Sequence, residues 1–527
     1  MVWLPLTQAV DVGPVSVLSA VVGLWALRRL IRIFTTLRAP SLFPKLYSAW
    51  DPMALPGVLL PTTWWNVGYS GHWIRRFRRY TGNETMNLVS VLGGTSGLWT
   101  SNLDIARQVS AGGHKTSFVK PEMASGALLL WGMNLVAADG QMWRKHRRIV
   151  GPAFGTELYK LVWKQTAQTY RDMVQTEGWN DKDVVNVPVI QNITTKVAFL
   201  IISACGFGFP ETPTGDADNE IPVQEALRVV AETYLLMLTV PEWVLHLPIP
   251  RFKKARMARD RLRTFMQQQV TERKAEVAAG NTRADAFTML VKANQDEAGK
   301  YQLDDQELIG NVFLFMFAGH ETTAHTLAAT LGFMALHPEI QDEVLDQIIA
   351  VVGPDRAPVF EDYPKLDKVL AIFYEAARMF PAGHILIREA TEDTVLTVPN
   401  PVGEEGSKTI PIPKGTQVTV DMVGVQYNPR YFENAEEYRP SRWYGLPSDS
   451  ELFTAFSVGP RACLGRRFAL VEAACFLTLL LRDWKISPIL NEGESKRAWE
   501  TRVMDAHIAL TLGVANVSLQ FERRKRA

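Results

Sequence analysis

A cysteine flanked by glycines near the C-terminal end of the chain has the surroundings that most clearly indicate chemistry. Cys463 lies between Gly459 and Gly465 in the segment FSVGPRACLGRRFA, and an apolar, helix-compatible run follows. Backbone N–H groups at the start of a helix stabilise a thiolate, and glycines let a flat, bulky group approach the backbone. Arg461 can meet an anionic group beside the sulfur. The loop therefore fits a thiolate that binds heme iron as an axial ligand.

The other two cysteines are predicted to be ordinary core residues. Three cysteines among 527 residues are too few for a disulfide scaffold, and this number fits a reducing compartment. Cys475 lies in the apolar run with no glycine or arginine beside it, and the same buried role is expected of Cys205.

An acid and a hydroxyl interrupt a long apolar helix. Asp304 and Glu307 form a capping box, and helical periodicity continues to Leu336, a length of about 50 Å at 1.5 Å per residue. Glu321 and Thr322 lie in the middle of this helix, where a hydroxyl can divert a backbone carbonyl. We therefore expect a local opening of the helix there. For Glu321 alone, a solvated notch on the helix face is an equally good interpretation.

Two further spacings place paired side chains on one helical face. Glu375 and Arg378 are three residues apart in a segment of little polar character, so we expect a partly buried pair with further partners. Trp143 and Arg147 are four residues apart in QMWRKHRRIVGPAF, which puts them on one face as well.

Together these motifs resemble those of the cytochromes P450. The pattern Phe-x-x-Gly-x-Arg-x-Cys-x-Gly-x-x-x-Ala is complete from Phe456 to Ala469 and includes Gly465. The resemblance implies that Cys463 is the proximal ligand to the iron of heme b. It also implies that Arg461 meets a heme propionate.

The resemblance assigns roles to the other motifs as well. It implies that Glu321 and Thr322 organise proton delivery to dioxygen. It implies that Trp143 and Arg147 hydrogen-bond a propionate, and that Arg388 is a further propionate contact.

A structural network is implied beside the cofactor site. By resemblance, Glu375 and Arg378 join Arg442 to brace the heme-binding core. The chain departs from the family pattern at Gln426, where many relatives have histidine, and at Ser441, where glutamate is common. These departures bear on the subfamily and not on the activity.

The N-terminal residues predict a membrane-associated segment. Residues 12–27 carry no charge, and three arginines follow at once between residues 28 and 32. A signal peptide would carry its positive charge before the apolar run, so we expect residues 1–38 to form an anchor helix with a basic flank. An interfacial helix is the close alternative. We expect residues 39–62 to be a Pro-rich linker, and residues 63–527 to be the heme-thiolate catalytic domain.

The rest of the chain predicts one large, mainly α (α+β) domain. Helical periodicity dominates residues 141–342, and strand-like segments occur at 393–398 and 416–420. The resemblance implies the cytochrome P450 fold, a triangular helical domain with small β-sheets. The positive-inside bias places this domain on the cytosolic side. The resemblance, with the anchor, implies the endoplasmic reticulum membrane.

Composition and charge limit the partners. With 56 Lys and Arg against 55 Asp and Glu, the net charge is +1, so no global field favours nucleic acid. No dinucleotide or P-loop motif occurs, so electrons must come from another protein. The resemblance, with the anchor, implies an NADPH–cytochrome P450 reductase. Five basic residues form either a local basic patch near the proximal face or an ordinary solvated surface, and the two interpretations are equally good: Arg144, Lys145, Arg148, Arg466 and Arg467.

The predicted activity is that of a monooxygenase that inserts one oxygen atom from O2 into a lipophilic organic substrate. The chain resembles fungal secondary-metabolite oxidases, which suggests a terpenoid or another secondary metabolite as the substrate. The family topology implies that Phe315, Ala318, Gly319 and Ile385 line the pocket, which suits an apolar molecule. A heme-thiolate isomerase or dehydratase that does not use O2 is the alternative, although it has no need of Glu321 and Thr322. A heme sensor or membrane scaffold is a third hypothesis.

Overall fold

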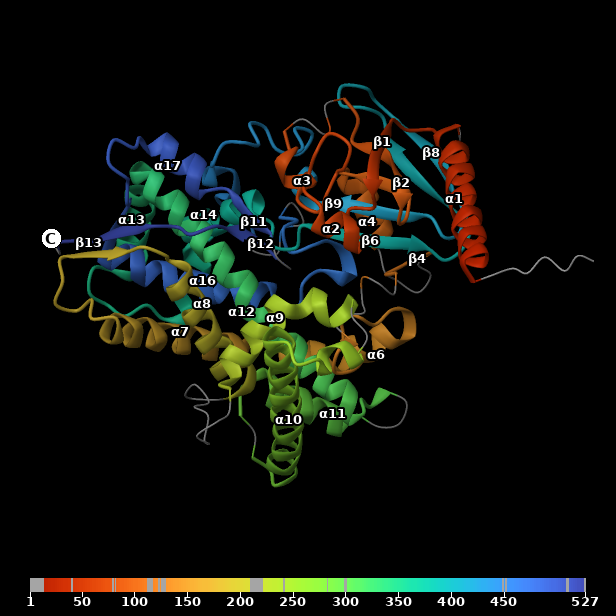
Figure 1. Cartoon of the computed structure of the whole chain (residues 1–527). Helices are drawn as coiled ribbons and strands as arrows, with labels where there is room; N and C mark the ends of the chain where they lie inside the picture. Colours follow the sequence, from red (N-terminus) through yellow and green to blue (C-terminus); the bar gives the residue numbers. More distant parts are fainter. Residues whose placement is uncertain are drawn as a thin grey trace, which may run out of the picture.

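Helices make up most of the molecule, and the strands gather into small sheets (Figure 1). The expected mainly helical α+β architecture is therefore confirmed. The computed structural model describes residues 14–38, 41–77, 80, 82–110, 117–121, 124, 129–208, 221–239, 242–281, 283–297, 301–447, 450, 453–508 and 511–525.

The order of elements shows helices grouped in the first two thirds and most strands toward the two ends of the chain. The helices are α1 (Pro14–Arg38), α2 (Leu55–Leu59), α3 (Gly71–Ile74), α4 (Leu103–Ser110), α6 (Gly140–Val150), α7 (Thr156–Thr176), α8 (Gln191–Ile201), α9 (Val223–Thr239), α10 (Pro250–Ala278), α11 (Ala286–Asp296), α12 (Asp305–Leu336), α13 (Pro338–Val352), α14 (Asp367–Met379), α15 (Met422–Gln426), α16 (Arg466–Asp483) and α17 (Lys496–Val503). The strands are β1 (Lys45–Trp50), β2 (Thr85–Gly93), β3 (Gly97–Thr100), β4 (Phe118–Val119), β5 (Val184–Val187), β6 (Ile385–Ala390), β7 (Thr394–Pro399), β8 (Ser407–Ile412), β9 (Gln417–Asp421), β10 (Trp484–Pro488), β11 (Ala506–Ile508), β12 (Leu512–Val514) and β13 (Leu519–Arg523).

The long helix α12 crosses the helical region and packs on α8, α10 and α14 (Figure 1). It begins with the predicted capping box. Asp304 Oδ1 accepts from the backbone N–H of Glu307 at 2.8 Å, and Glu307 Oε2 accepts from the backbone N–H of Asp304 at 2.9 Å. It ends at Leu336, as the periodicity predicts.

The helix stays continuous where the sequence predicts a local opening. Thr322 Oγ1 donates to the carbonyl of Ala318 at 2.9 Å, and Thr323 Oγ1 donates to that of Gly319 at 3.1 Å. A carbonyl oxygen has two lone pairs, so it can accept the hydroxyl and still accept the helical N–H. The predicted opening is therefore absent from α12.

The largest sheet has the strand order β1-β2-β3-β9-β6-β4. Its edge strand β1 pairs in parallel with β2, so part of the segment predicted to be a linker, residues 39–62, is sheet. Proline cannot donate to a ladder and is tolerated beside an edge strand; Pro44 and Pro52 flank β1 in this way. The strands expected at 393–398 and 416–420 are β7 and β9.

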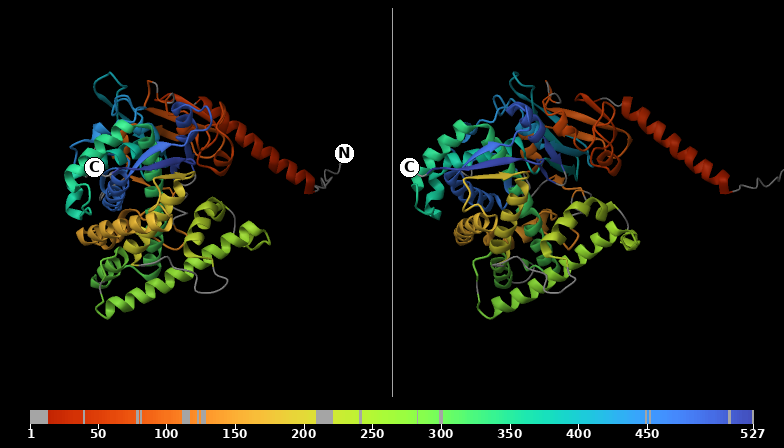
Figure 2. Two further views of the ribbon diagram at one scale, coloured as in Figure 1. Left: turned by 90° about the vertical axis from the view of Figure 1, so that its left-hand side faces the viewer. Right: turned by 60° about the vertical axis from the view of Figure 1, so that its left-hand side comes forward.

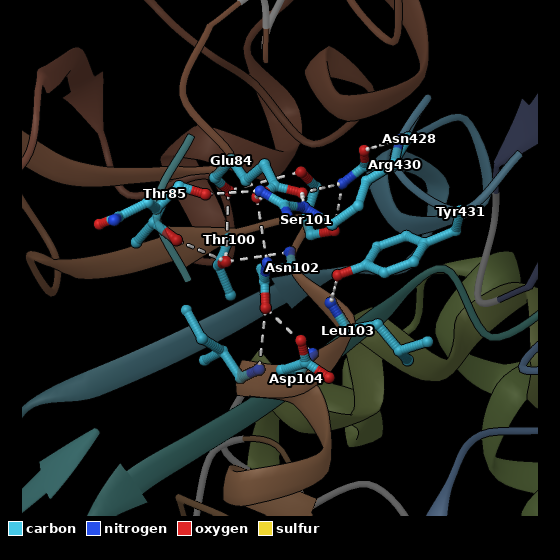
Figure 3. A network of polar contacts seen from close by, with 12 residues as sticks. Glu84, Thr85, Thr100, Ser101, Asn102, Leu103, Asp104, Asn428, Arg430 and Tyr431 are labelled. Atoms are coloured by element: carbon cyan, nitrogen blue, oxygen red, sulfur yellow. Dashed lines mark hydrogen bonds and ion pairs between the residues drawn. The ribbon is translucent and has the colours of Figure 1, made fainter. Parts of the chain in front are cut away.

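A buried polar network ties this sheet to the segment after α15 (Figure 3). The carboxylate of Glu84 accepts from Arg430 Nη2 at 2.8 Å, from Asn428 Nδ2 at 2.6 Å and from Asn102 Nδ2 at 3.1 Å. Tyr431 adds a hydrogen bond. Its Oη accepts from the backbone N–H of Leu103, the first residue of α4, at 2.9 Å. The network fixes the residues beside β2 and β3 and the start of α4 to the segment after α15.

Helix α1 contacts β2 and extends outward from the body (Figure 2). Among the described residues, none of the helices combines the length and the apolar character that crossing a bilayer requires. The first part of the predicted anchor, residues 1–13, lies outside the described residues.

Candidate active site

A cavity of about 1070 Å³ lies between α12 and the loop that precedes α16. Cys463 is in its wall on one side, and Thr322 is in the wall formed by α12. The predicted pocket residues Phe315, Ala318 and Ile385 line it, and so does Gly319. The tertiary structure thus brings the cysteine loop and the middle of α12 to one space.

The cysteine loop is a tight turn that presents its sulfur to the cavity. The backbone N–H of Cys463 donates to the carbonyl of Phe456 at 2.9 Å, which closes the loop. Gly459 has φ +72° and Ser457 has φ +66°, conformations that favour glycine and that turn the chain sharply. Gly465 is the N-cap of α16, and it lies in the cavity wall with Phe456.

Opposing effects act on the thiol. Burial raises the pKa of Cys463, because a thiolate loses hydration there, whereas the backbone N–H groups of Gly465 and Arg466 lower it. A bound metal ion would supply the missing charge compensation. By contrast, Cys205 and Cys475 are buried in the protein core, as predicted.

Helix α6 supplies the predicted pair Trp143 and Arg147, and both line the cavity. Arg461 lies over the Trp143 ring, with its guanidinium carbon 4.7 Å from the ring centroid. Arg461 Nη1 donates to the carbonyl of Ala138 at 2.7 Å, and the guanidinium also pairs with Asp139. Asp139 is the N-cap of α6, so the start of this helix and the cysteine loop are joined directly.

Two more cations complete this part of the cavity wall. Arg388, on β6, was predicted, but Lys120 was not. Burial, together with repulsion from Arg461 and Arg388, lowers the pKa of Lys120 to about 7 despite the attraction of Asp139. Burial also lowers the pKa of Arg388 to about 10. The neighbouring sequence around Lys120 has no recognisable motif, so only the fold reveals it.

The residues present fit a heme. Lys120, Arg147, Arg388 and Arg461 all line the cavity. Lys120, Arg388 and Arg461 lie close enough to act electrostatically on one another and on Asp139, which forms an ion pair with Arg461. Cations held in a desolvated site favour an anionic ligand. The two propionates of a heme match this excess of positive charge, while the thiol of Cys463 faces the same space.

The two residues of the predicted proton relay have different surroundings. Thr322 lies in the cavity wall, whereas Glu321 does not belong to it in the described part of the chain. Glu321 Oε1 instead accepts a hydrogen bond from Thr511 Oγ1 at 2.7 Å. At Gly319, a Cβ would lie 2.9 Å from Ile202 Cδ1, so glycine lets the neighbouring helical segment pack closely there.

The predicted ion network is confirmed. Glu375 and Arg378 are fully buried, and Arg378 donates two hydrogen bonds of 3.0 and 2.9 Å to the Glu375 carboxylate. Arg442 Nε also donates to Glu375, at 3.0 Å. Trp443 Nε1 donates to Glu375 at 2.7 Å, a contact that sequence reasoning missed. Arg378 Nη1 donates to the carbonyl of Gln426 at 2.8 Å. Glu375 thus has several donors, which a buried carboxylate needs.

This fold and site are those of a heme-thiolate protein. The cytochrome P450 family model matches residues 75–504, and the chain belongs to that family. The family implies a heme-thiolate cofactor, and the chain is a cytochrome P450 monooxygenase.

Curated relatives are similar over most of their length. The chain is 34% identical to "Cytochrome P450 monooxygenase 124" of Postia placenta, over 78% of this chain and 80% of that protein. It is 26% identical to "Cyclooctat-9-en-7-ol 5-monooxygenase" of Streptomyces melanosporofaciens, over 71% and 76%. It is 25% identical to the "Phomenoic acid biosynthesis cluster cytochrome P450 monooxygenase" of Leptosphaeria maculans, over 79% and 77%.

Proposed function

We propose that the chain inserts one oxygen atom from O2 into a lipophilic organic molecule, a terpenoid or another secondary metabolite. Electrons come from NADPH through a separate NADPH–cytochrome P450 reductase. The observation that carries the proposal is the cavity in which the Cys463 thiol and the Thr322 hydroxyl share one space with apolar side chains.

The substrate class follows from the cavity wall. Besides the cations, apolar side chains line the cavity, among them Leu55, Val58, Phe315, Ile385 and Leu386. Such a surface binds an apolar molecule by excluding water from both partners. Two relatives support a specialised metabolite, because their names refer to cyclooctat-9-en-7-ol and to phomenoic acid biosynthesis.

The chain's own groups have separate tasks. Heme b, held by Cys463 and by the cations around its propionates, supplies O2 activation when bound. Arg461 and Trp143 orient the cofactor from the side of α6. The Thr322 hydroxyl holds a proton at the cavity wall, where the reaction consumes protons. Apolar residues exclude water from the reacting carbon.

The reductase would dock on the side of the cysteine loop. Of the five predicted basic residues, Lys145 pairs with Glu307 at 2.6 Å and Arg148 with Glu297 at 2.9 Å. Arg467, at the start of α16, is exposed. Because Lys145 and Arg148 are paired with acids, we expect a weaker positive electrostatic potential at this surface than the sequence predicts. Arg467 should be its main contributor.

Helix α1 supports membrane association on the cytosolic face of the endoplasmic reticulum. Its side chains Leu24, Trp25, Leu30 and Ile31 are each more than half exposed. Apolar side chains of this kind, followed by arginines, are suited to a membrane surface. Deleting residues 1–38 should move the protein from the membrane fraction to the supernatant. Unchanged sedimentation with membranes would contradict this proposal.

The proposed activity is tested in membranes that contain the chain and a fungal reductase, supplied with NADPH and candidate terpenoids under 18O2. Product with one 18O atom, formed only with NADPH, is expected. Product formed without NADPH and O2 would overturn the proposal in favour of an isomerase or dehydratase.

A matched pair of cysteine variants tests the site itself. Cys463→Ala should abolish heme retention and the shifted ferrous–CO absorption band. Cys475→Ala should keep both, because Cys475 is buried in the protein core, where its Sγ donates to the carbonyl of Trp163 at 3.5 Å. Retention of heme and band by Cys463→Ala would contradict the assignment of the thiolate.

A further inference from the structure

Glu321 is connected to a second polar cluster on the outer side of α12. Thr511 Oγ1 donates to its carboxylate at 2.7 Å. Thr511 precedes β12 and is close to the C-terminus in sequence, far from α12. The next residue of α12, Thr322, lines the cavity. Thr322 therefore lines the cavity, whereas its neighbour Glu321 is hydrogen-bonded to the residue that precedes β12.

The same threonine hydroxyl also meets an imidazole. Thr511 Oγ1 lies 3.1 Å from Nδ1 of His325, which is one helical turn after Glu321. A threonine hydroxyl has a single proton, and Glu321 receives it. His325 must therefore be the donor to Thr511, which fixes its tautomer with the proton on Nδ1. The three groups form one directed chain, from His325 through Thr511 to Glu321.

A glycine makes this arrangement possible. A Cβ on Gly513 would lie 2.5 Å from Nδ1 and 2.6 Å from Cγ of His325, closer than real Cβ contacts. The imidazole therefore packs directly on the backbone of β12. In the β11–β12 hairpin, Gly513 is paired with His507, and His507 is exposed to solvent. The inner end of the chain of hydrogen bonds is at Glu321, and the outer end is beside the surface.

The surrounding groups keep His325 neutral. Burial lowers its pKa, Glu321 raises it, and His507 and His320 lower it again. His320 is occupied elsewhere, because its Nδ1 lies 2.8 Å from the carbonyl of Met316 on its own helix. A neutral imidazole with its proton on Nδ1 can accept another proton at Nε2. His325 can therefore pass a proton without holding a lasting charge.

We propose that His325 and Thr511 form the proton-supply arm of the enzyme, which reprotonates Glu321 from the solvent beside His507. In each passage, Nε2 of His325 takes up a solvent proton and Nδ1 releases its proton to Thr511 Oγ. The hydroxyl releases its own proton to the Glu321 carboxylate. One proton enters and one is delivered, and no electrons move. His325 is left as the Nε2–H tautomer, and proton exchange with solvent returns it to the Nδ1–H tautomer before the next passage. His325 and Thr511 act through Glu321 and are positioning residues.

This inference rests on the proposed role of Glu321 and Thr322 in proton delivery. It adds residues that no motif indicated, since Thr511 and Gly513 lie in an unremarkable stretch of sequence.

The first test is spectroscopic and does not depend on turnover. In the heme-loaded ferrous–CO protein with 15N-labelled histidine, His325→Gln identifies the resonance of His325. The wild-type protein should show the neutral Nδ1–H tautomer. Thr511→Val should change its tautomer or chemical shift, and Thr511→Ser should restore the wild-type signal. An Nε2–H tautomer in the wild type would overturn the proposal.

The second test measures proton supply during reductase-driven NADPH consumption without added substrate. Thr511→Val and His325→Gln should each increase the share of NADPH recovered as hydrogen peroxide several-fold. Each should also reduce the solvent deuterium isotope effect on the rate of NADPH consumption. His337→Gln is the matched control, because His337 caps the C-terminal end of the same helix and, within the described part of the chain, its acidic partner is the exposed Glu339. The ferrous–CO band confirms that each variant is folded.

The outcomes distinguish the supply arm of His325 and Thr511 from the relay of Glu321 and Thr322. If Glu321→Gln and Thr322→Ala increase peroxide but Thr511→Val and His325→Gln do not, the supply arm is wrong and the relay stands. If none of the four variants changes the peroxide share, both the arm and the proposed relay are wrong.

Discussion

Arg461 lies over the ring of Trp143 at 4.7 Å, which joins the cysteine loop to the start of α6. The two residues come from distant motifs, and their contact builds one side of the propionate site. The same guanidinium is bonded to the carbonyl of Ala138 at 2.7 Å and pairs with Asp139. Cofactor retention should therefore depend on Arg461 more than on other arginines near α6.

Replacing Arg461 should weaken heme binding. A hydrogen bond to a charged group contributes about 1.5–3 kcal/mol, so Arg461→Ala should release heme to an excess of apoglobin about 10- to 100-fold faster. Arg148→Ala is the control, since Arg148 is largely exposed and pairs with Glu297 at the surface. Equal rates of heme loss in the two variants, followed by Soret absorbance, would contradict the propionate assignment.

Heme affinity should depend on pH through Lys120. Burial lowers the pKa of Lys120 to about 7, and propionates beside it would raise that pKa. Binding then takes up a proton above pH 7, so affinity should fall as the pH rises from 7 to 9, by at most about tenfold per unit.

The Lys120→Met variant should remove this dependence. Its heme affinity, measured by competition with a globin, should be lower at pH 7 and nearly constant between pH 7 and 9. If the heme affinity of the variant falls with pH as steeply as that of the wild type, a group other than Lys120 titrates.

Thr322→Ala should uncouple NADPH consumption from productive turnover. Removing a hydroxyl from the cavity wall takes away a proton donor, so the peroxide share should rise several-fold, and Thr322→Ser should restore it. Thr330→Ala is a matched control, because Thr330 makes the same kind of bond, to the carbonyl of Thr326 at 2.7 Å, but is buried away from the cavity. Equal peroxide shares in Thr322→Ala and Thr330→Ala would argue against the relay.

Glu375→Gln should destabilise the heme-loaded protein. The substitution leaves the fully buried Arg378 without its carboxylate, and breaking a buried pair costs about 3–5 kcal/mol. The Tm should fall, and the share of protein with the thiolate-type ferrous–CO band should fall with it. Glu433→Gln is the control, since Glu433 is 81% exposed and its contact with Arg439 is 3.5 Å long. A Tm loss no greater than that of the control would contradict the bracing role.

The sequence by itself determined the features that depend on neighbouring residues. The glycines and arginine around Cys463, the spacing of Glu375 and Arg378, and the capping box of Asp304 all act over a few residues, so a linear pattern reveals them. The mainly helical fold followed from periodicity for the same reason.

Only the tertiary structure decided which distant groups meet. Lys120, Trp443 and Thr511 have no motif, and each gains its role from a partner far away in sequence. The strand in the segment expected to be a linker also needed its partner β2, because an edge strand forms only where a neighbouring strand supplies hydrogen bonds. The continuity of α12 at Thr322 likewise depended on how the carbonyl of Ala318 shares its lone pairs. Such contacts depend on packing in three dimensions, which residue spacing along the chain does not encode.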